Sequence, residues 1–142
     1  MCAPAVLAQT SFLTGAPVQM TKVKRGTSAS IRLACDLKPG FHVNSNKPAE
    51  DFLIPLRLTW EKGVLEVGEV VFPKALSKTF AFSEKPLSVY EGAFDVRTRF
   101  RVPAGAPSGL GMMTGKLRYQ ACNDRECFPP KTVEIRVPLQ VE

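Results

Sequence analysis

Two cysteines near the C-terminal end of the chain are the residues whose type and spacing could do chemistry. Cys122 and Cys127 lie in the segment YQACNDRECFPP, residues 119–130, with four polar residues between them and two prolines after them. A close cysteine pair has three possible uses. It can be a structural disulfide, half of a metal site, or a redox pair that exchanges electrons with a partner.

The flanking residues predict that the cysteine pair lies at the tip of a hairpin. Residues 117–122 alternate between apolar and polar, and a second alternating segment, 132–139, follows the prolines. Such alternation is typical of strands with one buried face. We therefore expect residues 123–126 to form the turn, with the two cysteines opposite each other at a separation that allows a disulfide.

The size of this loop favours a redox role over a structural one. Loop entropy gives a bond across so short a loop only about 2 kcal/mol of stabilisation. The polar setting is also expected to leave both sulfurs near solvent, where a partner thiolate can attack. A structural disulfide remains the alternative at this stage.

A metal site is disfavoured because the chain offers too few ligands. A closed zinc site needs four Cys or His ligands, and the other candidates are Cys2, Cys35 and His42. A blue-copper site needs two histidines, whereas this sequence contains one. Cys35 lies on the apolar face of an alternating segment, so we expect it to be a small core residue. We predict no metal.

Period-two alternation recurs along the whole chain and predicts an all-β fold. Turn-forming Gly and Pro residues separate the segments, and no stretch of 12 residues shows helical periodicity. Seven to nine short strands of this kind predict an immunoglobulin-like antiparallel β-sandwich. The strongest strand signals lie at 29–37, 54–60, 94–102 and 133–139, and weaker ones at 18–24, 64–72 and 110–121. Pro55 places the segment 54–60 at an edge or makes it the start of a strand.

Length and charge narrow the class of protein further. A chain of 142 residues suits one domain, which we place at 11–142. The net charge is +6, but Lys and Arg are scattered singly, so we expect no nucleic-acid binding. No apolar run approaches the roughly 20 residues that cross a bilayer. Residues 1–10 are expected to do no chemistry, as the tail of an export signal or as an arbitrary boundary.

Three segments resemble the N-terminal periplasmic domain of the DsbD family of transmembrane thiol:disulfide interchange reductases. They are YQACNDRECFPP followed by KTVEIRVPL, then GFHVNSNKP at 40–48, and VYEGAFDVRTRFRVP at 89–103, which resembles the strand after the family's cap loop. The similarity spans roughly residues 14–140. The cysteine loop is one residue shorter than in the best-known members.

The resemblance implies a role for each cysteine and a set of partners. Cys122 and Cys127 would cycle between disulfide and dithiol, with Cys127 attacking clients and Cys122 resolving the mixed disulfide. A thioredoxin-like domain would donate the electrons. The clients would be periplasmic thioredoxin-fold proteins, such as a disulfide isomerase or a cytochrome c maturation thioredoxin. No cofactor is implied, the location is the periplasm, and the parent protein would be embedded in the inner membrane.

The resemblance also implies a cap loop that protects the reduced pair. The candidate is TFAFSEKP, residues 79–86, with Phe80 or Phe82 as the shield. The alternative is that both rings are ordinary core residues of a strand. Phe41 and His42 are expected to line the same site, with His42 a surface or hydrogen-bonded residue rather than a proton shuttle.

The remaining candidate residues surround the cysteines in sequence. Asp124 and Glu126 would disfavour a thiolate and Arg125 would oppose them, which predicts a thiol that is not strongly acidic. Tyr119 and Gln120 are expected to support the hairpin, and Phe128, Pro129 and Pro130 to fix its exit. The alternative function is a secreted immunoglobulin-like binding or assembly module with a structural hairpin disulfide.

Overall fold

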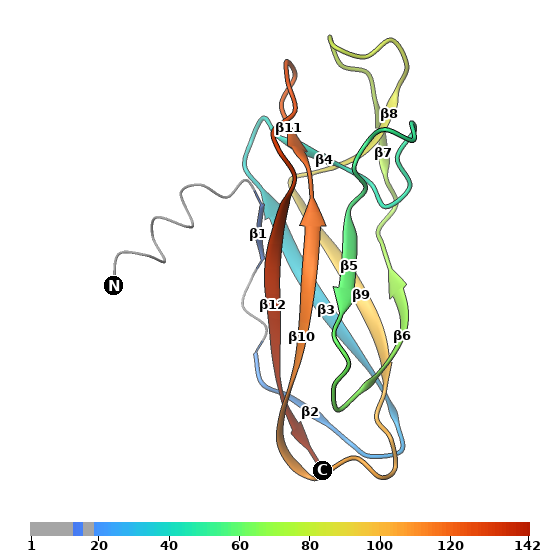
Figure 1. Ribbon diagram of the computed structural model, residues 1–142, viewed down its shortest axis with the longest axis vertical. Helices are drawn as coiled ribbons and strands as arrows, with labels where there is room; N and C mark the ends of the chain where they lie inside the picture. The colour runs from blue at the N-terminus through green and yellow to red at the C-terminus, as the bar shows by residue number, and fades with distance from the viewer. Residues whose placement is uncertain (1–12, 16–18) are drawn as a thin grey trace, which may run out of the picture.

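The computed structural model describes residues 13–15 and 19–142, and this part of the chain is entirely β-structure and loops (Figure 1). The strands are β1 (Leu13–Gly15), β2 (Thr21–Val23), β3 (Ser28–Leu37), β4 (His42–Asn44), β5 (Arg57–Trp60), β6 (Glu66–Val71), β7 (Leu76–Lys78), β8 (Leu87–Glu91), β9 (Ala93–Arg101), β10 (Gly109–Tyr119), β11 (Ala121–Cys122) and β12 (Lys131–Val141). The predicted all-β class is confirmed.

The strands form three four-stranded sheets. Two of them, with the orders β1-β3-β9-β6 and β2-β12-β10-β5, face each other as a sandwich. The third, β11-β4-β8-β7, lies at the end of the sandwich opposite the C-terminus, at the top of Figure 1. All pairs are antiparallel except β2 with β12, which is parallel and departs from the expected pattern.

Alternating apolar side chains close the core between the two large sheets. In β3 and β9, every second residue points inward, as predicted for 29–37 and 94–102. In β10 and β12, the register runs from Gly109↔Val141 to Tyr119↔Lys131, so these strands form a long ladder that ends at the cysteine hairpin. The core side chains include Ile31, Leu33, Val96, Phe100, Met113, Leu117, Ile135 and Val137.

Pro55 shortens the strand predicted at 54–60. Only residues 57–60 join the ladder, as β5, because a proline has no N–H to donate. The strand lies at the edge of its sheet, as the proline indicated. The preceding residues contact β4 instead, since Asn44 Nδ2 donates to the Ile54 carbonyl at 3.0 Å.

The third sheet is the part of the fold that sequence alternation missed. Its strands β4 and β7 have three residues each, which is too short to show a period. The chain bends at Gly92, a turn-forming residue just before the strand predicted at 94–102, and its φ of 61° is the left-handed region that glycine favours. The bend sends β8 into the third sheet and β9 into the first.

Two predictions concern how the chain divides into an N-terminal segment and a domain. Residues 1–10 lie outside the described part, and the assignment of 11–142 to one domain stays a prediction. The described residues include no apolar helix of the length that a bilayer crossing requires.

Candidate redox site at the cysteine hairpin

Cys122 and Cys127 form a disulfide across the tip of the hairpin. Their Cα atoms are 4.0 Å apart and their sulfurs 2.03 Å apart. The turn between them is held by backbone hydrogen bonds, because Asn123 N donates to the Glu126 carbonyl at 2.9 Å. Asn123 Oδ1 also accepts from the N–H groups of Arg125 and Glu126, both at 2.8 Å. The predicted turn at 123–126 is confirmed.

The exit of the hairpin is fixed by contacts with β11 and the start of β4. Phe128 N donates to the Ala121 carbonyl at 2.9 Å, and Gln120 Nε2 donates to the Phe128 carbonyl at 3.2 Å. The Phe128 ring lies 5.9 Å from that of Phe41, between centroids. Gln120, Phe41 and Phe128 therefore gather at the hairpin, while Pro129 is exposed before β12 begins.

The two sulfur-bearing residues differ sharply in exposure. Cys122 is 1% exposed, whereas Cys127 is exposed. The expectation that both sulfurs lie near solvent is therefore wrong for Cys122. The reason is that Cys122 belongs to β11, which pairs with β4, while Cys127 lies in the return segment beside exposed Asp124 and Glu126. Only Cys127 is open to a partner protein.

His42 lies directly across the sheet from Cys122. In the β11–β4 pair, Cys122 is opposite His42, and in the β4–β8 pair, His42 is opposite Glu91. Residues directly opposite each other in an antiparallel pair share a face. Cys122, His42 and Glu91 thus form one row across three strands. Lys78 of β7 is opposite Leu87 in the sheet, but its side chain reaches this row, where Nζ donates to Glu91 Oε2 at 2.6 Å.

The environment of His42 differs from the expected surface position. The residue is 1% exposed, and its Nε2 atom has no hydrogen-bond partner within the described residues. Burial lowers the pKa of His42, while Glu91 raises it and Lys78 lowers it. The expectation of a surface histidine is wrong, because the segment after β7 covers this face of the sheet.

Phe80 and Phe82 form that cover. The Phe80 ring stacks on the His42 ring with centroids 4.0 Å apart, and Phe82 lies 5.6 Å from Phe80. Both rings belong to the loop between β7 and β8, so the alternative that they are core residues of a strand is wrong. Phe82 is 41% exposed, and its ring centroid lies 6.3 Å from that of His42.

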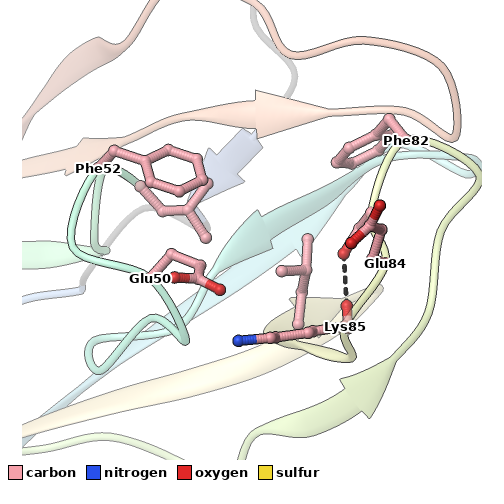
Figure 2. Close-up of a pocket in the computed structure, with 8 residues that line it drawn as sticks. Glu50, Phe52, Phe82, Glu84 and Lys85 are labelled. Atoms are coloured by element: carbon pink, nitrogen blue, oxygen red, sulfur yellow. Dashed lines mark hydrogen bonds between the residues drawn. The ribbon is translucent and has the colours of Figure 1, made fainter.

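A pocket of about 260 Å³ opens on the other side of the β7–β8 loop (Figure 2). Phe52 and Phe82 lie at two sides of it, and Phe52 is 79% exposed. The loop is held locally by a hydrogen bond from Ser83 Oγ to the Lys85 carbonyl. The lining residues are Glu50, Phe52, Leu53, Phe82, Ser83, Glu84, Lys85 and Leu87. The loop therefore contacts His42 on one side and borders this pocket on the other.

Tyr119 is a core residue at the base of the cysteine hairpin. Its side chain is fully buried at the end of β10, and its hydroxyl has no hydrogen-bond partner among the described residues. Cys35 is a buried free thiol, as expected, and burial, with a smaller contribution from Asp95, raises its pKa to about 12. Over 13–15 and 19–142, no group of three metal-ligating side chains is present.

Glu91 and Lys78 are the residues of this site that sequence reasoning missed. Glu91 was read only as part of a turn with Gly92. Its position opposite His42 depends on the register of β4 with β8, and β4 itself is too short to be predicted. The available signal was the opposite charge of Lys78 and Glu91, which flank the candidate cap loop 79–86 in the sequence.

A β-sandwich with a disulfide on a hairpin, in which one cysteine is exposed, has the type of site that thiol–disulfide exchange domains use. The profile of the family described as the N-terminal part of thiol:disulfide interchange protein DsbD matches residues 9–139. The chain belongs to this family.

Two solved structures are similar to this chain to different degrees. The N-terminal domain of Neisseria meningitidis DsbD in the reduced form is similar, with a TM-score of 0.57 and 17% identity over 96% of this chain and 92% of that chain. The seventh ScaB type I cohesin from Pseudobacteroides cellulosolvens gives a TM-score of 0.49 and 14% identity over 92% of each chain. No curated protein matches the chain.

Proposed function

We propose that this chain is a periplasmic thiol–disulfide exchange domain. It accepts electrons from a thioredoxin-like domain and reduces the disulfides of periplasmic client proteins through Cys122 and Cys127. The observation that carries the proposal is the disulfide between an exposed and a buried cysteine, with Cα atoms 4.0 Å apart. Such a pair can be opened from outside at one sulfur and closed again from inside by the other.

Each half of the cycle is a two-electron exchange. In the client half, the Cys127 thiolate attacks one sulfur of the client disulfide, and the other client sulfur leaves as a thiolate. The Cys122 thiolate then attacks Cys127 Sγ and displaces the remaining client sulfur. The client is reduced and the chain is oxidised. A dithiol of the donor domain reverses the process, so the chain needs no cofactor.

Family membership and the exposed residues around Cys127 support the choice of partners. The donor and the clients are thioredoxin-fold proteins, such as a disulfide isomerase or a cytochrome c maturation thioredoxin, and the parent protein is embedded in the inner membrane. Exposed Asp124, Arg125 and Glu126 surround the reactive sulfur and form part of the docking face. The chain then acts as the protein-disulfide reductase domain of a thiol:disulfide interchange reductase.

The reduction potential of the pair tests this proposal. In a variant with Cys2→Ser and Cys35→Ala, thiol trapping in glutathione buffers should give roughly −180 to −270 mV, the range of exchange proteins. A potential below about −300 mV is typical of structural disulfides. That result would replace the proposal with a secreted binding or assembly module.

The stacked rings of the β7–β8 loop give a second expectation. Phe80→Ala should raise the rate at which oxidised glutathione oxidises the reduced chain, because removing the ring from the face that holds Cys122 would open a second sulfur to attack. An aromatic stack is worth about 0.5–1.5 kcal/mol, so the increase should be roughly two- to tenfold. Phe82→Ala should have the smaller effect, since Phe82 is the more exposed ring and lies farther from His42.

The matched control for the loop variants is Phe52→Ala, which removes a ring from the far side of the pocket. It should leave the oxidation rate unchanged. Equal rates for Phe80→Ala and the unmodified chain would mean that the rings do not shield the pair.

A further inference from the structure

His42 has a buried polar atom that the fold leaves without a partner. The residue is 1% exposed, and Nε2 makes no hydrogen bond within the described part of the chain. An unsatisfied polar atom in such a place is destabilising. An apolar ring would stack on Phe80 without that cost, so packing alone does not account for a histidine at this position.

The place of His42 in the sheet connects it to the chemistry of the cysteines. It is the registered partner of Cys122, and side chains directly opposite each other have Cβ atoms about 4.5–5.5 Å apart. The register therefore places His42 and Cys122 side by side on the same face of the third sheet. Among the described residues, the sheet register places only two side chains opposite Cys122, those of His42 and of Cys127, its partner in the disulfide.

The surroundings of His42 favour its neutral form, which has a free ring nitrogen that can accept a proton. Burial is the largest influence and lowers its pKa, so at neutral pH the imidazole is uncharged and one ring nitrogen is an acceptor. The charged groups that act on it are Glu91 from β8, which favours the protonated ring, and Lys78 from β7, which opposes it. The cap loop faces it with the uncharged rings of Phe80 and Phe82.

We propose that His42 is the proton acceptor for the Cys122 thiol when Cys122 resolves the mixed disulfide between Cys127 and a partner. This inference rests on the function proposed above and adds a residue to it. Cys122 is closed to solvent, so bulk water is poorly placed to take its proton, and burial in apolar surroundings disfavours a thiolate. The acceptor must therefore come from inside the site.

Resolution of the mixed disulfide by Cys122 conserves protons and electrons. The proton of the Cys122 thiol moves to His42, and the resulting thiolate attacks Cys127 Sγ. The bond between Cys122 and Cys127 forms, the bond between Cys127 and the partner sulfur breaks, and the electron pair leaves with the partner thiolate. In the reverse direction, the Cys122 thiolate released by an incoming donor thiolate takes the proton back from His42.

Glu91 completes the arrangement as a positioning residue. It is opposite His42 on β8 and would stabilise the imidazolium that forms. Its hydrogen bond from Lys78, at 2.6 Å, fixes the carboxylate on this row. The order Cys122, His42, Glu91 thus leads from the buried sulfur to a carboxylate near the surface.

The test separates the two chemical steps by time. The reduced chain, with Cys2→Ser and Cys35→Ala, is mixed with the aromatic disulfide dithiobis-nitrobenzoate in a stopped-flow instrument. The first thionitrobenzoate is released when Cys127 attacks, and the second when Cys122 closes the ring. The variants are His42→Gln, which keeps a polar side chain, and His42→Phe, which keeps the stack on Phe80.

We expect both variants to leave the first phase unchanged and to slow the second at pH 7 by about 10²-fold, the lower end of general acid–base effects. The pH dependence of the second-phase rate distinguishes proton transfer from a purely structural role, which would not change it. In the unmodified chain, the second phase should be level above the pKa of His42 and fall below it. In the variants, it should rise with hydroxide concentration over the same range.

A second phase of unmodified rate in either variant overturns the inference, as does equal slowing of both phases. These outcomes differ from failure of the proposed function. If the chain with His42 intact released no second thionitrobenzoate, the cysteines would not form an exchanging pair at all.

Discussion

Replacing Cys122 with Ser should convert the chain into a trap for its partners, while replacing Cys127 with Ser should abolish partner capture. Cys127 is exposed and Cys122 is 1% exposed, so only Cys127 can start an exchange. Without Cys122, the mixed disulfide has no internal thiol to resolve it and accumulates. Without Cys127, the remaining thiol of the pair is that of Cys122, which is buried in β11 of the third sheet.

The measurement is the fraction of chain that carries one added glutathione after incubation with oxidised glutathione, read by mass spectrometry in a Cys2→Ser background. We expect a nearly complete adduct for Cys122→Ser and almost none for Cys127→Ser. Cys35 should not contribute, because burial raises its pKa to about 12. An adduct that forms equally in both variants would contradict the exposure difference on which the proposed roles depend.

Tyr119→Ala should be the more damaging of two substitutions at the base of the hairpin. The ring is fully buried where β10 ends, and truncating a large buried aromatic side chain costs about 3–5 kcal/mol. Tyr119→Phe removes only a hydroxyl that has no hydrogen-bond partner among the described residues. That variant should be as stable as the unmodified chain, or more stable by up to about 1 kcal/mol.

Urea unfolding of the oxidised chain measures both variants on one scale. The slope of the free energy of unfolding against urea concentration should be unchanged if each variant still unfolds from the same sandwich. A loss of more than about 1 kcal/mol in Tyr119→Phe would show that the hydroxyl has a partner in solution. The reduction potential of Tyr119→Phe should stay the same, since the ring acts on the cysteines only through the hairpin.

The long strands of this protein could be predicted because their side chains repeat many times. In β3, β9 and β12, several buried residues alternate with exposed ones, and each repeat strengthens the pattern. The turn at 123–126 was predictable for a related reason. Alternation stops at Cys122, four polar residues follow, and prolines precede the next alternating strand.

The third sheet could not be predicted, and the details of the site depend on it. Three residues in β4 give no period, yet they decide that Cys122 is covered and that His42 is buried. The exposure of a cysteine depends on distant segments, here β4 and the loop that holds Phe80. The four polar residues 123–126 adjoin both cysteines, so the local sequence predicted that both sulfurs are exposed. In the structure, Cys127 is exposed and Cys122 is buried.

The single exposed sulfur has a consequence for the order of events. If the proposed function holds, the donor domain and the client would both act on Cys127, the exposed cysteine of the pair. The chain therefore cannot hold both at once, and each must leave before the other arrives. Turnover is then ping-pong, with the two partners competing for one docking face. A tight complex with either partner would slow the cycle, so weak and short-lived encounters suit this geometry best.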